Sequence, residues 1–267
     1  MKKGVLILLM GLLTQAVSGL FVVKNFGEDP ELHLVDYQVF KRGERMEYLV
    51  HYGWIDAGKA IVEVQNEDME YQGRTMLHIK GWGRSKGAFD FFYKVRDYYE
   101  TVMDPDSMVP YHFVRDINEG GFKFRKEYNF DRENQRVVTH NGEIIKVPGG
   151  VQDLLSSYYF ARHIDLDSYQ IGDVISFKAI VDEKVEPLRI RYLGKEKVKI
   201  KTGTYRCHKF QPLVQEGRIF DDPEDLTVYI SDDKNKVPVL MKADVLVGSI
   251  KMELISWEGL LHDLARE

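Results

Sequence analysis

Asp97 and Arg115 are the oppositely charged residues whose surroundings most favour a site. Each lies among apolar neighbours on one face of a predicted strand, and the turn Asp104-Pro105-Asp106-Ser107 joins the two strands. A hairpin centred on Asp106 would place the two side chains opposite each other. Burying either charge alone costs several kcal/mol, so each needs a partner. The pattern predicts a structural ion pair between them or, as the alternative, an arginine that recognises a ligand.

Aromatic residues are concentrated around Asp97. Residues 89–99 hold six of them, which is more than one strand face can bury. Either some of these rings cover a cavity mouth or an exposed patch, or they share a core with a helix predicted over 151–163. The candidate ligand-binding residues are Trp54, Trp82, Phe89, Phe92, Tyr93, Asp97, Tyr99 and Arg115.

Other reactive residue types lack the spacing that catalysis needs. Gly83-Arg84-Ser85-Lys86-Gly87 fits the G-x-S-x-G pattern, but no alternation of strands and helices surrounds it, so we interpret it as a turn. Cys207 and His208 are neighbours in a predicted strand and point to opposite faces, so they cannot form a catalytic dyad and we expect Cys207 to be a small buried apolar residue. The eight histidines show no metal-ligand spacing. We therefore expect no catalytic residue, metal or cofactor. A hydrolase using Asp97, Asp116 or Glu119 stays as an alternative.

Lysines line one face of a later predicted strand at positions 195, 197, 199 and 201. Such a row deters strand addition at a sheet edge, which is the interpretation we favour. Binding of an anionic partner is the alternative.

The elements that position these residues are mostly strands. Apolar and polar residues alternate with period two through most of the chain, which predicts an all-β, mainly antiparallel fold. Helical spacing is clear only after Pro148-Gly149-Gly150, where Val151, Leu154, Leu155 and Tyr158 predict a helix ending near His163. Leu260, Leu261 and Leu264 suggest a last helical turn or two.

The two halves of the chain resemble each other. Glycine turns, alternating strands and a Val-Pro pair recur in the same order, for example at Val109-Pro110 and Val237-Pro238. This order favours an internal duplication of a β-meander. The expected segments are an N-terminal arm 19–40, a first β-rich half 41–148, a connecting helix and loop 149–170, a second half 171–258 and a tail 259–267.

The N-terminus predicts export. Lys2 and Lys3, an apolar stretch from Val5 to Leu13 and Ala16-Val17-Ser18 have the form of a signal peptide over residues 1–18. We expect a protein that is soluble in the cell envelope or periplasm, with no transmembrane segment after signal removal. Lipid anchoring needs a cysteine at the cleavage site, and the single cysteine is Cys207. The net charge of −5 argues against nucleic-acid binding.

Several stretches resemble the domain-of-unknown-function 3108 family of exported bacterial proteins. They are Tyr52-Gly53-Trp54-Ile55-Asp56-Ala57-Gly58-Lys59-Ala60, Phe92-Tyr93-Lys94-Val95-Arg96-Asp97, Arg115-Asp116-x-Asn118-Glu119-Gly120-Gly121, Gly203-Thr204-Tyr205-x-Cys207 and Val237-Pro238-Val239. The resemblance implies an envelope location and a β-rich fold, and it transfers no catalytic residue. At the level of fold alone, each half is also similar to the half-barrels of periplasmic lipoprotein carriers.

Three functions follow as expectations. The first is a non-catalytic carrier of an apolar or amphiphilic ligand such as a lipid, acyl chain or glycolipid, because aromatic residues are in excess and no catalytic constellation is seen. The second is a module that binds a protein partner or assembles in the envelope. The third is the carboxylate-based hydrolase.

Overall fold

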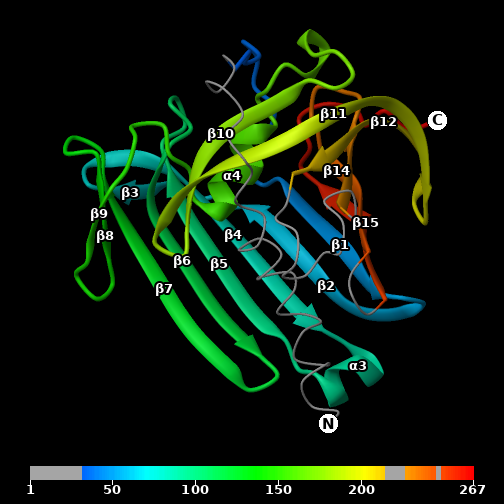
Figure 1. The fold of residues 1–267 in the computed structure, drawn as a ribbon, viewed down its shortest axis with the longest axis horizontal. Coiled ribbons are helices and arrows are strands. Elements are labelled where there is room, and N and C mark those ends of the chain that lie inside the picture. The colour runs from blue at the N-terminus through cyan, green and yellow to red at the C-terminus, as the bar shows by residue number, and fades with distance from the viewer. Residues whose placement is uncertain (1–31, 214–225, 245–247) are drawn as a thin grey trace.

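The computed structural model describes residues 32–213, 226–244 and 248–267, and these form a single antiparallel sheet around one helix (Figure 1). The first half contributes nine strands, β1 (Arg45–Tyr52), β2 (Ile55–Val64), β3 (Met69–Tyr71), β4 (Arg74–Ser85), β5 (Arg96–Met103), β6 (Pro110–Glu119), β7 (Phe122–Asp131), β8 (Arg136–Thr139) and β9 (Ile144–Lys146). The second half contributes β10 (Val174–Val181), β11 (Lys184–Ile200), β12 (Gly203–Pro212), β13 (Leu226–Ser231), β14 (Pro238–Asp244) and β15 (Ser249–Glu258). The predicted all-β class is confirmed.

The two halves join edge to edge in one continuous sheet. β1, the first strand of the chain, pairs with β2 on one side and with β15, the last strand, on the other. Strands β1, β2, β4, β5, β6 and β7 follow one another as a meander, and β10 to β15 repeat that order. This arrangement is consistent with the predicted duplication.

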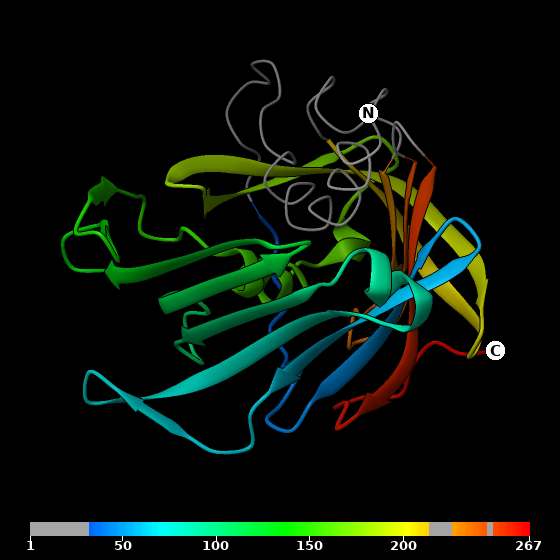
Figure 2. The ribbon, with the colours of Figure 1, turned by 90° about the horizontal axis from the view of Figure 1, so that it is seen from below.

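The sheet curls so that its far ends approach each other over one face (Figure 2). The turn between β10 and β11 reaches β7, where Lys126 Nζ lies 2.9 Å from Asp182 Oδ1 and 2.6 Å from Glu183 Oε2. The outer edge of β10 pairs with the segment that connects the two halves, because Gln152 forms a parallel β-bridge with Ala179. A hollow face therefore encloses the segment that connects the halves.

Helix α4 (Leu154–Ala161) occupies this hollow and is shorter than the predicted 151–163. It begins at Asp153, whose carboxylate accepts the main-chain N–H groups of Leu155 and Ser156 in a capping box. Tyr158 packs against the hydrophobic clusters of both halves. The 3-10 helix η1 (Leu166–Ser168) follows, and a second helix, α3 (Gly87–Phe92), lies between β4 and β5.

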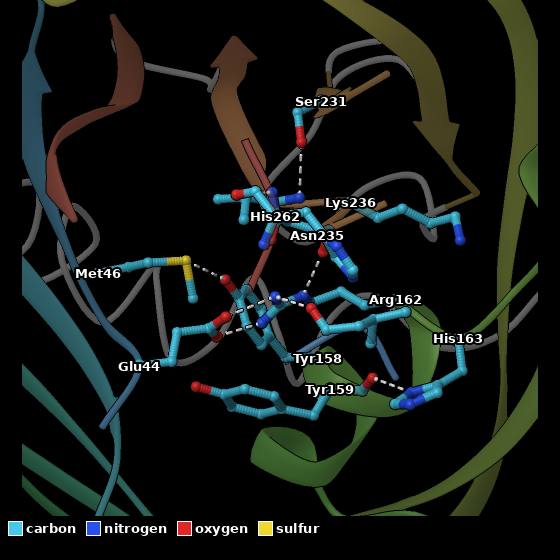
Figure 3. A network of polar contacts seen from close by, with 12 residues as sticks. Glu44, Met46, Tyr158, Tyr159, Arg162, His163, Ser231, Asn235, Lys236 and His262 are labelled. Carbon is cyan, nitrogen blue, oxygen red and sulfur yellow. Dashed lines mark hydrogen bonds and ion pairs between the residues drawn. The ribbon is translucent and has the colours of Figure 1, made fainter. Parts of the chain in front are cut away.

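A buried ion pair fixes α4 to both halves (Figure 3). The Arg162 guanidinium donates to both oxygens of Glu44, at 2.5 and 2.9 Å, and its Nε donates to the Asn235 carbonyl at 2.8 Å. Glu44 is fully buried and Arg162 is 3% exposed. Because each charge satisfies the other in a dry interior, the pair sets the position of the helix end.

Val39 and Phe40, from the predicted arm 19–40, are buried in the main hydrophobic cluster, while the part of the arm before residue 32 lies outside the described residues. One expectation for the C-terminus needs correction. The tail 259–267 has no helical turn. It runs extended instead, because Arg266 bridges to Tyr205 and Asn235 binds the carbonyls of His262 and Asp263. The predicted signal peptide 1–18 also lies outside the described residues.

Candidate functional site

A cavity of about 240 Å³ lies between the hollow face of the sheet and helix α4. Strands β1, β2, β4 and β5 form its floor, and α4 forms its roof with Leu154, Leu155 and Tyr158. Most of the lining is apolar. The lining residues are Val50, Lys59, Ala60, Ile61, Val62, Gly81, Trp82, Gly83, Arg84, Val95, Asp97, Tyr99, Leu154, Leu155 and Tyr158.

Two glycines of β4 create the space. Gly81 lies opposite Tyr99 and Gly83 opposite Asp97 in the β4–β5 register. A β-carbon added at Gly81 would meet the nearest side-chain atom of Tyr99 at 3.5 Å and that of Leu155 at 3.8 Å. Both positions would therefore accept a β-carbon at ordinary contact distance, and with glycine they leave a hollow below α4. Glycine inside a strand costs stability, so its use here favours a role in close approach of a ligand.

Asp97 is the acidic group that lines the cavity. Its Oδ1 accepts the Asn118 main-chain N–H at 3.1 Å, and the residue is 6% exposed. Burial raises the pKa of Asp97, while the Asn118 N–H, a hydrogen bond with Glu119 and the charge of Arg115 oppose that rise. Asp97 and the neighbouring Glu119 therefore form a pair of interacting carboxyl groups at the cavity wall.

Arg115 is buried beside this pair, in a register that differs from the prediction. The strands β5 and β6 place Tyr99, not Asp97, opposite Arg115. The turn is longer than expected because Asp104 Oδ1 binds the N–H groups of Asp106 and Ser107, and the register shifts after Val102. The predicted hairpin centre at Asp106 is therefore wrong.

Arg115 connects the cavity wall to the far end of the sheet. Its Nη1 lies 3.4 Å from Asp182 Oδ1 in the β10–β11 turn, and its guanidinium lies 4.9 Å from the centre of the Phe124 ring. A hydrogen bond from Arg115 reaches the Tyr99 hydroxyl, whose pKa is nevertheless raised by burial. Arg115 thus holds Tyr99 at the cavity wall.

The remaining candidate aromatics divide into three groups. Phe89 and Tyr93 are buried in a small cluster with Ala57 and Val95. Trp82 borders the cavity through its main chain, since its ring packs on Tyr98 at 6.1 Å on the opposite face of the sheet. Trp54 and Phe92 are exposed, at 91% and 71%.

Phe92 precedes the strand that carries Asp97, because residues 87–92 form α3 and β5 begins at Arg96. The aromatic residues at 89–99 were expected either to share a core with helix α4 or to form an exposed patch, and the structure shows some of each. Tyr99 packs against the cluster that includes Leu155, whereas Phe91 and Phe92 are exposed.

The reactive residue types have structural partners. Ser85 donates its hydroxyl to Asp90 and accepts the Val95 N–H at 2.7 Å. Burial raises the pKa of the Cys207 thiol to about 12, which keeps it protonated, as expected for a buried apolar residue. Asp167, His208 and Asp232 converge closely enough for a cation, but Lys195 Nζ already lies 2.9 Å from both carboxylates.

The carboxylates proposed for hydrolysis are not arranged around a cleft. Asp116 faces the other side of the sheet, with Arg125 Nη1 at 3.4 Å, whereas Asp97 and Glu119 bond directly to each other. A glycosidase needs its two carboxyl groups about 5 to 10 Å apart, with the substrate between them.

The chain belongs to the DUF3108 family, proteins of unknown function, whose model matches residues 47–255. A β-barrel-like protein of the DUF1849 family from Brucella abortus has a similar fold, with a TM-score of 0.56 at 10% identity, over 85% of this chain and 100% of that one. A DUF1089 family protein from Pseudomonas aeruginosa matches with a TM-score of 0.36 at 9% identity, over 91% and 98% of the two chains. No curated protein matches. In the part of the chain that the structure describes, neither helix is long and apolar enough to cross a membrane.

Sequence reasoning missed the site-forming role of Gly81, Gly83, Ala60 and Val62. The signal for the glycines was present, because two glycines alternate inside a twelve-residue strand. The cavity itself needs the sheet order and the position of α4, which a single sequence does not specify.

Proposed function

We propose that this protein is a non-catalytic binding or carrier protein for an amphiphilic ligand, held in the cavity between the sheet and α4. The observation that carries the proposal is the apolar hollow below α4, with the buried Asp97 at its wall. An engineered cavity of about 150 Å³ binds benzene, so 240 Å³ accommodates a short apolar segment of a lipid, acyl chain or glycolipid.

The polar group at the wall suggests how the ligand is oriented. Asp97 lies beside Gly83 in the cavity, and its pKa is raised by burial. A hydroxyl or other uncharged hydrogen-bond donor of the ligand could bind this carboxyl group, which would orient the ligand in the cavity. With the predicted signal peptide, this suggests a carrier in the cell envelope or periplasm.

Native mass spectrometry of protein purified from its own envelope, followed by solvent extraction, tests the proposal. The expected result is a discrete added mass that is recovered as a lipid or glycolipid. Gly81→Val fills the cavity floor, so occupancy should fall at least about tenfold. Gly149→Val, at a glycine outside the cavity, is the control and should retain the ligand. An added mass that survives Gly81→Val unchanged would place the ligand elsewhere.

A module for a protein partner remains the second candidate. It is favoured by the exposed aromatic residues on α3, Phe91 and Phe92. A ligand-free mass together with a specific envelope protein recovered by crosslinking at Phe92 would favour this candidate over the carrier.

A further inference from the structure

Large exposed hydrophobic side chains gather at one end of the sheet. Trp54 is 91% exposed, Phe91 87%, Phe92 71% and Phe122 60%. These four residues, which we call the aromatic rim, belong to three segments that are far apart in the sequence. Exposed aromatics of this size are unfavourable in water, so their grouping points to a binding surface.

Strand pairing brings the three segments together. The β1–β2 turn carries Trp54, helix α3 carries Phe91 and Phe92, and the β6–β7 turn precedes Phe122. These connections all lie at the same end of adjacent strands, the end that Figure 2 views. The Gly120 N–H donates to the Lys94 carbonyl at 2.9 Å, so the α3 segment and the β6–β7 turn touch.

Helix α3 is anchored with its outer rings facing away from the protein. Phe89 and Tyr93 are buried with Ala57 and Val95, and the Lys86 N–H donates to the Ala57 carbonyl at 2.9 Å. Phe91 and Phe92, at the end of this short helix, remain exposed while Phe89 and Tyr93 on either side of them are buried. Their exposure is therefore a consequence of the fold.

Positive charge accompanies the aromatic rim, although the whole chain is acidic. Lys94 and Lys123 are exposed, and neither forms an ion pair with another described residue. The nearby Asp90 is matched by Arg96 at 2.7 Å, which holds the pKa of that carboxyl at about 2. Asp56, the exposed acid beside Trp54, pairs with His51 at 2.9 Å and with Lys86 at 3.4 Å. The two lysines are left to face an external anion.

From these observations we infer that the aromatic rim docks on the surface of an anionic lipid bilayer. Aromatic rings at a membrane interface place their apolar parts among the acyl chains, and flanking lysines contact the headgroups. A protein partner with an apolar groove would not require the lysines. This surface goes beyond the carrier function and does not depend on what fills the cavity. Val95 nevertheless belongs to both the cavity lining and the cluster that anchors α3, so the two regions adjoin.

Vesicle co-sedimentation of the processed full-length protein tests the inference. We expect binding to phosphatidylcholine vesicles that contain phosphatidylglycerol, and weaker binding without it. The double variant Phe91→Ser/Phe92→Ser should weaken binding at least about tenfold, because each ring loses its burial in the interface. Ile144→Ser, at a residue that is 59% exposed on β9, is the matched control and should bind normally.

The charge contribution is tested separately. Lys94→Glu/Lys123→Glu should lower binding to phosphatidylglycerol vesicles about tenfold or more, and this loss should shrink at high salt. Lys146→Glu, at an exposed lysine of β9, is its control. In a Trp82→Phe/Trp257→Phe background, the emission of Trp54 should shift to the blue on vesicle binding.

Three results would overturn the inference. They are absence of vesicle binding, rim variants that bind as tightly as the unchanged protein, and a rim that mediates self-association instead. Gly81→Val should leave vesicle binding unchanged, so failure of the carrier function and failure of membrane docking can be told apart.

Discussion

Arg162 connects three separate parts of the chain through one side chain. It binds Glu44 from the segment before β1 and the Asn235 carbonyl from the loop before β14, and its guanidinium lies 5.3 Å from the centre of the Tyr159 ring. Glu44 raises the pKa of Arg162 despite burial, which normally lowers it. The Arg162 guanidinium therefore stays charged in the folded protein.

Removing one partner of this pair should cost more stability than removing both. Arg162→Met leaves the Glu44 carboxylate buried without a counter-charge, so we expect a loss of about 3 to 5 kcal/mol in the free energy of unfolding. Glu44→Leu/Arg162→Met should recover most of that loss. Urea unfolding at neutral pH measures both variants. Equal losses in the single and double variants would show that the pair acts through packing instead.

Asp153 should make stability depend on pH. Burial raises its pKa from 3.8 to about 6 in the folded protein, although Thr101 and the α4 N–H groups favour the charged form. A raised carboxyl pKa contributes stability that is fully present below about pH 4 and is lost as the pH rises through about 6. The loss amounts to about 3 kcal/mol.

Asp153→Asn provides the comparison, because asparagine also caps helices but does not titrate. Chemical unfolding at a series of pH values from 4 to 7 should show the stability of the unchanged protein falling relative to that of the variant. A constant difference over this range would contradict the assignment.

At the scale of elements, the second part of β11 forms an edge of the sheet. Its residues beyond Tyr192 pair only with β12 among the described residues, and Lys195, Lys197 and Lys199 lie along this stretch. The arrangement fits the predicted role of lysines at a sheet edge, where charge prevents another strand from adding. Lys197 also pairs with Glu267 at 2.9 Å.

Replacing these lysines should promote self-association. Lys197→Val/Lys199→Val gives the edge a high strand propensity and removes its charge, so we expect dimers or larger aggregates at concentrations where the unchanged protein is monodisperse. Light scattering measures this. Lys80→Val in β4, which has a neighbour on both sides, should have no such effect. If both variants aggregate equally, surface charge in general is responsible.

The alternation of apolar and polar residues predicted most of the strands, but it did not predict helix α3 or the register of β5 and β6. Residues 87–92 are rich in phenylalanine, which favours strands, yet they form a helix that buries Phe89 among Ala57, Tyr93 and Val95. The register depended on Asp104, whose side chain lengthens the turn by binding main-chain N–H groups. Such hydrogen bonds from a side chain to the main chain change the length of a turn. They cannot be predicted from the pattern of hydrophobic residues.

At the scale of the whole molecule, the halves are parts of one cooperative unit. The main hydrophobic cluster combines Phe113 and Tyr128 of the first half with Leu155, Tyr159 and Ile180 from later in the chain. The sequence predicted two similar halves and a helix between them. It did not reveal that they form a continuous sheet, because the β1–β15 pairing joins residues some 200 positions apart.

Separating the halves should therefore abolish independent folding. We expect fragments 32–148 and 149–267 to show no cooperative thermal unfolding alone, because each lacks one partner of the Glu44–Arg162 pair. Mixed from denaturant, they should form a 1:1 complex with the circular dichroism of the intact chain. A cooperative transition in either fragment alone would establish a domain boundary instead.

The pairing of β1 with β15 also has a consequence for biosynthesis. β1 is complete when residue 52 has left the ribosome, yet its partner strand begins at residue 249. Throughout that interval, one side of β1 presents unpaired main-chain groups, and the closure of so long a loop is slow. The nascent chain therefore cannot complete its native sheet until the residues of β15 have been synthesised, and the open side of β1 is available for non-native strand pairing until then.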